Sequence, residues 1–396
     1  MTGQRYKNSG RQHEQPILWA APCSAWSGKA RSYLIKKGVP FTELFPSHPR
    51  YMSEIMPAIG YFVMPVLELE DGTLIQDSTE IILHYEEALP TPALIPDSPL
   101  QRAVAWLVGF IGSELMSTPG LHYRWNYIDQ QRAYLESAFA EIISPARTRD
   151  QQREDITPVV NQFNAWPEKL GVNPATIPTV EAAYEENLRA LDDHFLHFPY
   201  LLGGRPSIAD FGLMTFFFAH FARDPYPSGV MKLHGPRVYR WTERMNTAQF
   251  ADGQFADIPP RYPEDDSIPE SLETVLRCLL ANCGPEMHGM LEVFNNWVEA
   301  NPDLPPGTEI NSNPDELGAH PPLENCTYEI KNTKFERLSF VDPVVHFQRV
   351  LEAVDDLDTA DRSRFDALME RTGGTNLLSM TPKRRVKFDN YRYVLA

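Results

Sequence analysis

The sequence predicts an α+β domain near the N-terminus, followed by an all-helical domain and a small C-terminal extension. The hydrophobic period changes between strand-like and helix-like several times within residues 16–90, whereas strand patterns disappear from residues 91–300. The chain has 396 residues, and at about 150 residues per domain this length predicts two or three domains. Many of the 35 prolines fall at the joins, and residues 301–396 form a proline-rich linker plus an extension of unknown role.

The first domain has the element order βαβα followed by ββα. Asp71-Gly72 predicts a tight hairpin turn because glycine supplies the positive φ that such turns need. Asp77 stands at an N-cap position with Glu80 three residues later, which is the spacing of a capping box. The predicted strands are 16–20, 39–45, 65–70 and 73–76, and the predicted helices are 30–37, 49–56 and 78–88. This order, βαβαββα, is the thioredoxin-like topology.

The second region shows helical spacing only. Ser207 and Asp210 form a second capping box before an almost entirely apolar helix, which we expect at the centre of its domain. Residues 117–178 are expected to be an irregular segment, and long ordered loops often line sites. The predicted helices are 100–116, 131–143, 179–198, 207–222 and 230–245. After a linker at 302–322, residues 326–340 predict strands, and 343–356 and 360–371 predict helices.

Composition excludes several classes of partner. The formal net charge of −17 repels nucleic acid and anionic lipid headgroups, so we expect neither as a partner. No apolar run reaches the roughly 18 residues of a membrane helix. The N-terminus is polar and has no apolar signal segment, so we expect a cytoplasmic protein whose four cysteines are thiols.

Three features of the first domain point to a pocket for a zwitterionic thiol peptide. Cys23 and Ser24 lie at the start of a helix, where a thiolate is stabilised. Met64-Pro65 precedes a strand, and a cis proline there would turn the main chain of Met64 towards an extended ligand. Asp77-Ser78 opens a helix whose N–H groups and hydroxyl suit a carboxylate, with Asp77 able to bind an amine.

At these positions the sequence resembles the glutathione transferase family, in the segments SAWSGKARSYLIKKGVPF, MPVLELEDGTLIQDSTEIILHYEE and LLGGRPSIADFGL. The resemblance implies that Ser24, or Cys23 as in some classes, contacts the glutathione sulfur. It implies that Met64, before Pro65, pairs with the cysteinyl part and that Asp77 and Ser78 hold the γ-glutamyl end. Asp77 is shorter than the Glu or Gln usual there, so we expect weaker glutathione affinity.

The function implied by the resemblance is activation of the glutathione thiolate for attack on a small hydrophobic electrophile, by a homodimer that needs no metal. If Cys23 faces the ligand, the chemistry shifts towards thiol transfer. Two alternatives stay open: a non-catalytic protein of the same fold that binds glutathione or another ligand, and a glutathione-dependent isomerase or reductive lyase. Candidate pocket walls are Trp106, Phe110, Tyr123, Arg124 and Trp125, although packing or a dimer contact also explains residues 121–127.

Other chemistry-bearing residues have simpler interpretations. His194 and His197 share a helical face but lack a third ligand, so we expect no metal site. Cys278 and Cys283 are expected to be buried thiols. The basic run at 383–387 is expected to be a salt-bridging surface rather than a nucleic-acid site.

Overall fold

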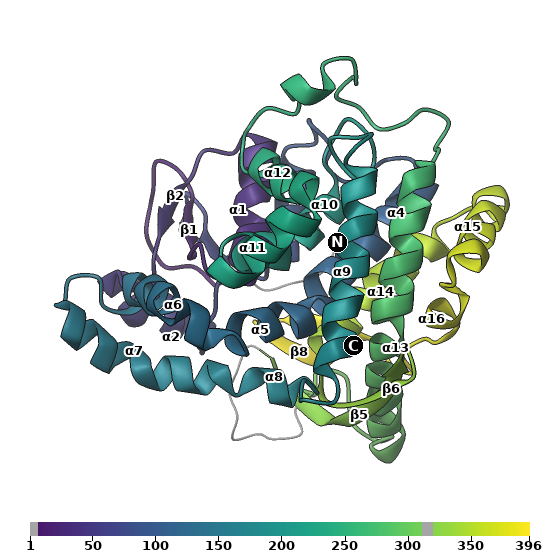
Figure 1. Cartoon of the computed structure of the whole chain (residues 1–396). Helices are drawn as coiled ribbons and strands as arrows, with labels where there is room; N and C mark the ends of the chain where they lie inside the picture. The colour runs from purple at the N-terminus through teal and green to yellow at the C-terminus, as the bar shows by residue number, and fades with distance from the viewer. Residues whose placement is uncertain (1–6, 311–319) are drawn as a thin grey trace.

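The computed structural model describes residues 7–310 and 320–396 (Figure 1). Two sequence predictions reach beyond these ranges. The polar lead-in includes residues 1–6 and the proline-rich linker includes residues 311–319, and those parts lie outside the described residues. The described chain forms a small sheet domain, a helical domain and an extension that lies along the helical domain (Figure 1).

The N-terminal domain has the predicted thioredoxin-like topology. Its four strands lie in the order β2–β1–β3–β4, with β1 and β2 parallel and the other two pairs antiparallel. The strands are β1 (Ile17–Trp19), β2 (Thr42–Leu44), β3 (Val66–Glu68) and β4 (Leu74–Gln76). The helices are α1 (Ala25–Lys37), the π-helical turn η1 (Tyr51–Ile55), α2 (Met56–Ile59) and α3 (Ser78–Ala88).

Local sequence explains where two of these helices begin and end. Helix α1 stops at Gly38, whose φ of 76° is left-handed and therefore favours glycine. Helix α3 starts at Asp77, whose Oδ1 accepts hydrogen bonds from the N–H groups of Thr79 (2.7 Å) and Glu80 (3.2 Å). The predicted N-cap at Asp77 is thus confirmed, and its carboxylate satisfies two N–H groups that the helix leaves free.

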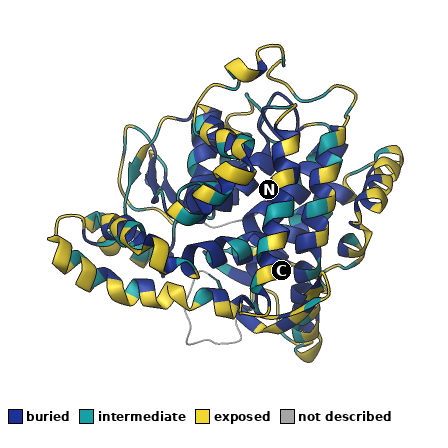
Figure 2. Ribbon diagram, viewed as in Figure 1, coloured by how far each residue is buried: buried dark blue, intermediate teal, exposed yellow. Residues whose placement is uncertain are grey.

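The helical domain is built around α10 (Ile208–Phe216), in which every residue is buried (Figure 2). The capping box of Ser207 and Asp210 is present as predicted. The other helical elements are α4 (Pro99–Phe110), η2 (Ile111–Leu115), α5 (Ser117–Trp125), α6 (Ile128–Ile143), α7 (Arg149–Asn164), α8 (Trp166–Lys169), α9 (Ile177–His194), η3 (Phe217–Ala222), α11 (Pro225–His234), α12 (Pro236–Met245), η4 (Gly253–Phe255) and α13 (Glu270–Ala300).

The prediction of an irregular segment at 117–178 is wrong, because this segment forms helices α5 to α8, although the helix predicted at 131–143 is present as α6. Proline and glycine hide the pattern: Pro119 and Gly120 lie in the first turn of α5, and Pro158 lies inside α7. Helix α7 is also mostly exposed, so it carries only a weak apolar stripe (Figure 2). Helices α6 and α7 form an antiparallel hairpin that projects from the domain (Figure 1).

The extension packs against the helical domain. Phe347 contacts Phe110 of α4 with ring centroids 5.3 Å apart, and both belong to one continuous hydrophobic core. The buried Arg337 pairs with Glu286 of α13. The elements of the extension are β5 (Pro322–Ile330), β6 (Thr333–Phe340), α14 (Asp342–Asp355), α15 (Thr359–Thr372), α16 (Thr375–Ser379), β7 (Val386–Asp389) and β8 (Arg392–Leu395). The strands and both helices predicted for residues 326–371 are therefore present.

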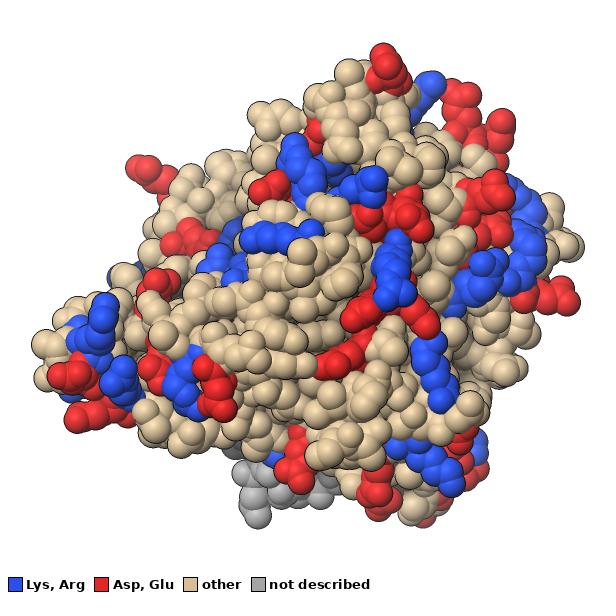
Figure 3. Space-filling view, viewed as in Figure 1, with Lys and Arg blue, Asp and Glu red and all other residues tan. Residues whose placement is uncertain are grey.

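Charged side chains of both signs are interspersed on the face shown in Figure 3. The basic run at 383–387 follows this pattern, since Lys383 pairs with Glu299, Arg385 with Glu352 and Lys387 with Asp389. The predicted salt-bridging role of this run is confirmed. Among the helices described, none is both long enough and apolar enough to cross a membrane.

Candidate functional site

A small cavity of about 30 Å³ lies where the N-terminal domain, the helical domain and the extension meet. It contains both halves of the predicted binding site, Met64-Pro65 and Asp77-Ser78. The lining residues are Trp26, Val63, Met64, Pro65, Gln76, Asp77, Ser78, Glu114, His320, Asp342, His346 and Tyr393. The four predicted glutathione-binding residues are thus brought together, with four residues of the extension set against them. Cys23 and Ser24 are not among the lining residues, and Trp26 is the residue of α1 that lines the cavity.

The Met64–Pro65 peptide bond is cis, as expected from the sequence. The chain before it is fixed by Tyr51, whose hydroxyl donates to the carbonyl of Val63 (2.5 Å) and accepts from its N–H (3.0 Å). Within the described residues, no hydrogen bond occupies the main chain of Met64. These groups remain available to an extended peptide-like ligand.

Asp77 is partly buried and uses its two carboxylate oxygens differently. Oδ1 caps α3, and Oδ2 lies 3.6 Å from Nε2 of His346. Burial opposes ionisation, but the charges of His346 and Lys29, with the two N–H groups of α3, hold the pKa of Asp77 below its ordinary value. The ionised form of Asp77 is therefore favoured, and it can bind a cationic group.

Several polar atoms in this cavity lack a hydrogen-bond partner. Among the described residues, the buried atoms Ser78 Oγ, Glu114 Oε1 and Asp342 Oδ2 are unpaired. Burial raises the pKa of Glu114. His320 contacts Asp342 through Nδ1 at 2.9 Å, and its ring lies 5.1 Å from that of Trp26. Unpaired buried groups cost free energy, so the cavity has spare capacity for a polar ligand or water.

The two candidate sulfur contacts have different environments. Cys23 is only 5% exposed, its carbonyl accepts a hydrogen bond from Arg124 (2.8 Å), and burial raises the pKa of its thiol. Ser24 is half-buried at the N-cap of α1, where its side chain makes no capping hydrogen bond. A raised thiol pKa disfavours the reactive thiolate, so the geometry favours Ser24 over Cys23 as the polar contact of a ligand sulfur.

Two family models match the chain at these elements. The model described as "Glutathione S-transferase, N-terminal domain" matches residues 23–88, and "Glutathione S-transferase, C-terminal domain" matches residues 174–244. The first match covers most of the thioredoxin-like domain, and the second covers part of the helical domain. The extension and α13 lie beyond both matches.

Similar solved structures include the β-etherase LigF from Sphingobium sp. strain SYK-6, with 19% identity over 61% of this chain and 98% of that chain, at a TM-score of 0.40. The Tau class glutathione S-transferase MiGSTU from mango, Mangifera indica, has 17% identity over 66% and 96%, at 0.34. A glutathione S-transferase from Methylobacterium radiotolerans in complex with glutathione sulfonate has 19% identity over 64% and 99%, at 0.36. A sequence comparison with curated proteins gives no match.

The five residues proposed as a substrate wall do not line the cavity between the glutathione S-transferase domains and the extension. Phe110 packs against the extension, and Trp106 lies half-buried beside the main core. Tyr123 stacks within an aromatic cluster, and Trp125 stacks on Phe163 of α7 with ring centroids 6.1 Å apart. Packing accounts for these four positions.

Arg124 also has a structural partner. Its buried guanidinium forms an ion pair with Asp224 (2.6 Å) and donates to the carbonyl groups of Cys23 and Ala219. In this geometry the guanidinium of Arg124 is engaged with protein groups and ties α5 to the loop before α1, which favours a structural role. The sequence does not reveal Asp224 as its partner, since the two residues are 100 positions apart.

The residues missed by sequence reasoning are the four from the extension. His320, Asp342, His346 and Tyr393 carry no local motif, and only docking of the extension brings them to Asp77. No group of three or more His, Cys, Asp or Glu in the described residues could hold a metal ion. His194 is instead bonded to Ser271 and to the carbonyl of Tyr200.

Proposed function

We propose that the protein is a glutathione-dependent enzyme of the transferase type. The observation that carries this proposal is the single cavity in which the free main chain of Met64 lies beside Asp77 and the unpaired hydroxyl of Ser78. The main chain of Met64 would pair with the cysteinyl part of glutathione. Asp77 and Ser78 would bind the ammonium and carboxylate groups of the γ-glutamyl part.

Catalysis would depend on the thiolate form of glutathione. The hydroxyl of Ser24 donates a hydrogen bond to the sulfur anion, and the N-terminus of α1 favours its negative charge. The thiol proton passes to solvent. The sulfur then forms a bond to an electrophilic carbon of a small hydrophobic substrate, and the leaving group departs with the electron pair of the broken bond.

Activity with chlorodinitrobenzene tests this role of Ser24. We expect Ser24→Ala to lower kcat/KM about tenfold or more, since it removes a donor to the developing charge. Cys23→Ala is the matched control next to it and should change kcat/KM less than about twofold, because the thiol is buried and its pKa is raised. Equal activity of wild type and Ser24→Ala would refute the proposed activation. Product analysis separates conjugation from isomerisation or reductive cleavage.

A non-catalytic protein of the same fold is the second candidate, favoured by the size of the cavity. Its volume of about 30 Å³ is far below the roughly 300 Å³ or more of ordinary ligand pockets. Calorimetric titration with glutathione is the first test, because a protein that binds no glutathione cannot be the proposed enzyme. A protein that binds glutathione but shows no turnover of any electrophile would be the non-catalytic candidate. Homodimerisation and a cytoplasmic location remain predictions of the same proposal.

A further inference from the structure

The extension fills the end of the cavity that a γ-glutamyl group would enter. This inference rests on the proposed function: we propose that α14 competes with glutathione for Asp77. Glutathione then binds only when the thioredoxin-like domain separates from the face formed by α14 and β8. The extension is in this sense an intramolecular inhibitor of the site.

The first contact is made by His346, which stands where the ammonium group of glutathione would bind. Its Nε2 lies 3.6 Å from Oδ2 of Asp77 and 3.9 Å from Oε1 of Glu114. The side chains of Asp77 and Glu114 are only 13% and 4% exposed. While His346 is in place, the anion at Asp77 already has a partner, and an ammonium group cannot approach it.

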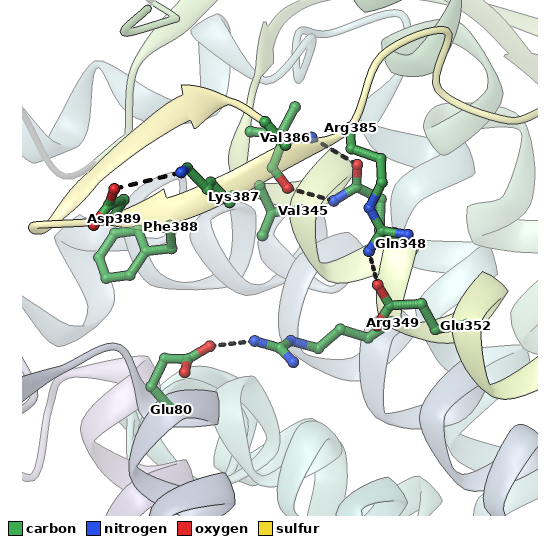
Figure 4. A pocket seen from close by; sticks show the side chains of 11 residues that line it. Glu80, Val345, Gln348, Arg349, Glu352, Arg385, Val386, Lys387, Phe388 and Asp389 are labelled. Carbon is green, nitrogen blue, oxygen red and sulfur yellow. Dashed lines mark hydrogen bonds and ion pairs between the residues drawn. The ribbon is translucent and has the colours of Figure 1, made fainter. Parts of the chain in front are cut away.

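A second polar contact between α14 and α3 lies about one helical turn beyond the first contact. Arg349 follows His346 by three residues on α14, and its guanidinium pairs with Glu80, which follows Asp77 by three residues on α3. Figure 4 shows the side chain of Arg349 pointing across the gap to Glu80, whereas Arg385 pairs with Glu352 within the extension. Because residues three apart share a helical face, α14 and α3 are held together by two matched polar pairs.

Other ionisable groups surround His346. Lys29 of α1 donates to Thr79 (2.8 Å) and lies close enough to interact with the charge of Asp77. From the extension, Asp342 and His320 complete the polar rim, and Tyr393 of β8 lines the same cavity. Asp77 and Asp342 therefore already have histidine partners within the protein in the absence of glutathione.

The packing of α14 shows which contacts would break on opening. Its apolar residues Val344, Phe347 and Val350 are fully buried in one continuous core, which also includes residues of the helical domain and of the thioredoxin-like domain. Towards α3 it presents the polar pairs described above. Opening of the cavity therefore requires these polar pairs to break.

The hairpin of β7 and β8 also contacts the thioredoxin-like domain. The hydroxyl of Tyr391 donates to the carbonyl of Leu74 (2.9 Å) and accepts from the N–H of Lys7 (2.8 Å). These hydrogen bonds must also break when the cavity opens. If the open form is a minor population, the measured affinity for glutathione is reduced by that fraction.

Glutathione affinity of variants in α14 tests this competition. We expect His346→Ala and Arg349→Ala each to lower the dissociation constant of glutathione about tenfold, because each raises the open population. Arg362→Ala is the matched control, since Arg362 pairs with Asp366 on the exposed surface of α15 and should leave affinity at the wild-type value. Circular dichroism checks that all four proteins are folded.

Hydrogen exchange of the wild type provides a second readout that needs no variant. Adding glutathione should speed amide exchange around Tyr391, because the contacts of its hydroxyl with Lys7 and Leu74 must break. Equal affinity in all four proteins with unchanged exchange would overturn the competition and leave the proposed function standing. No glutathione binding in any of the folded proteins would overturn the proposed function, and the competition with it.

Discussion

The buried side chain of His194 should make the folding stability of this protein depend on pH. His194 is fully buried, with Nδ1 2.9 Å from the hydroxyl of Ser271 and Nε2 3.2 Å from the carbonyl of Tyr200. Burial lowers its pKa from 6.5 to about 4. The unfolded chain therefore takes up this proton first, so the contribution of His194 to stability is complete above pH 6.5 and is lost as the pH falls towards 4.

Replacing this histidine should reduce that loss. From the two pKa values, His194 makes the wild type about 2 kcal/mol less stable at pH 5 than at pH 7. His194→Gln does not titrate, so its free energy of unfolding should fall by about 2 kcal/mol less than that of the wild type over this range. Chemical denaturation of both proteins at the two pH values measures the difference. Parallel losses in the two proteins would show that His194 is not responsible.

At the scale of elements, the crossing of α4 and α10 depends on glycine. A Cβ atom at Gly212 would lie 2.2 Å from the carbonyl oxygen of Gly109, and one at Gly112 would lie 2.5 Å from the main-chain nitrogen of Leu213. Both neighbours are backbone atoms, so neither can move without shifting a helix. The close contact of the two central helices therefore requires these small residues.

An alanine at Gly212 tests this requirement. We expect Gly212→Ala to destabilise the protein by at least about 2 kcal/mol, because the helices must move apart. Gly229 of α11 is a matched control, since a Cβ there meets no atom within 4 Å. Gly229→Ala should be stabilising by about 0.5–1 kcal/mol through helix propensity. Urea denaturation of the two variants measures both effects, and a destabilisation equal in size and sign would contradict the packing argument.

At the scale of the whole molecule, a buried ion pair joins the extension to the helical domain. Arg337 of β6 and Glu286 of α13 are each about 3% exposed at the side chain. Burial lowers the pKa of Arg337 to about 9. Thr118 of α5 also accepts a hydrogen bond from Arg337 (3.2 Å). The pair thus connects three segments that are remote in the sequence.

Removing one partner leaves the other as an isolated buried charge. Glu286→Leu should therefore cost about 3–5 kcal/mol, whereas adding Arg337→Met to it should recover most of this loss. Glu273→Ala is the comparison at the surface, where its pair with Arg371 (2.8 Å) is more exposed, and it should cost less than about 1 kcal/mol. Thermal unfolding of the four proteins ranks them, and a double variant as unstable as Glu286→Leu would refute the explanation.

The sequence by itself determined the local features of this protein. The thioredoxin-like element order, the N-cap at Asp77 and the capping box at Ser207 depend on residues close together in the chain, so their patterns are visible without the fold. Of the helices in residues 117–178, only α6 was visible in the local spacing, whereas α5, α7 and α8 were not. Their apolar residues pack against Cys23 and Met64 from another domain, and proline and glycine interrupt the local pattern.

Only the tertiary structure decided what surrounds the candidate site. The predicted thioredoxin-like topology placed Met64 and Asp77 in one pocket. No sequence pattern indicated that residues of the extension also line this pocket. Arg349 and Glu80 are 269 residues apart along the chain, and no local pattern encodes such a contact. The pairing follows from burial of the apolar side of α14 against the helical domain, which leaves its charged side facing the site.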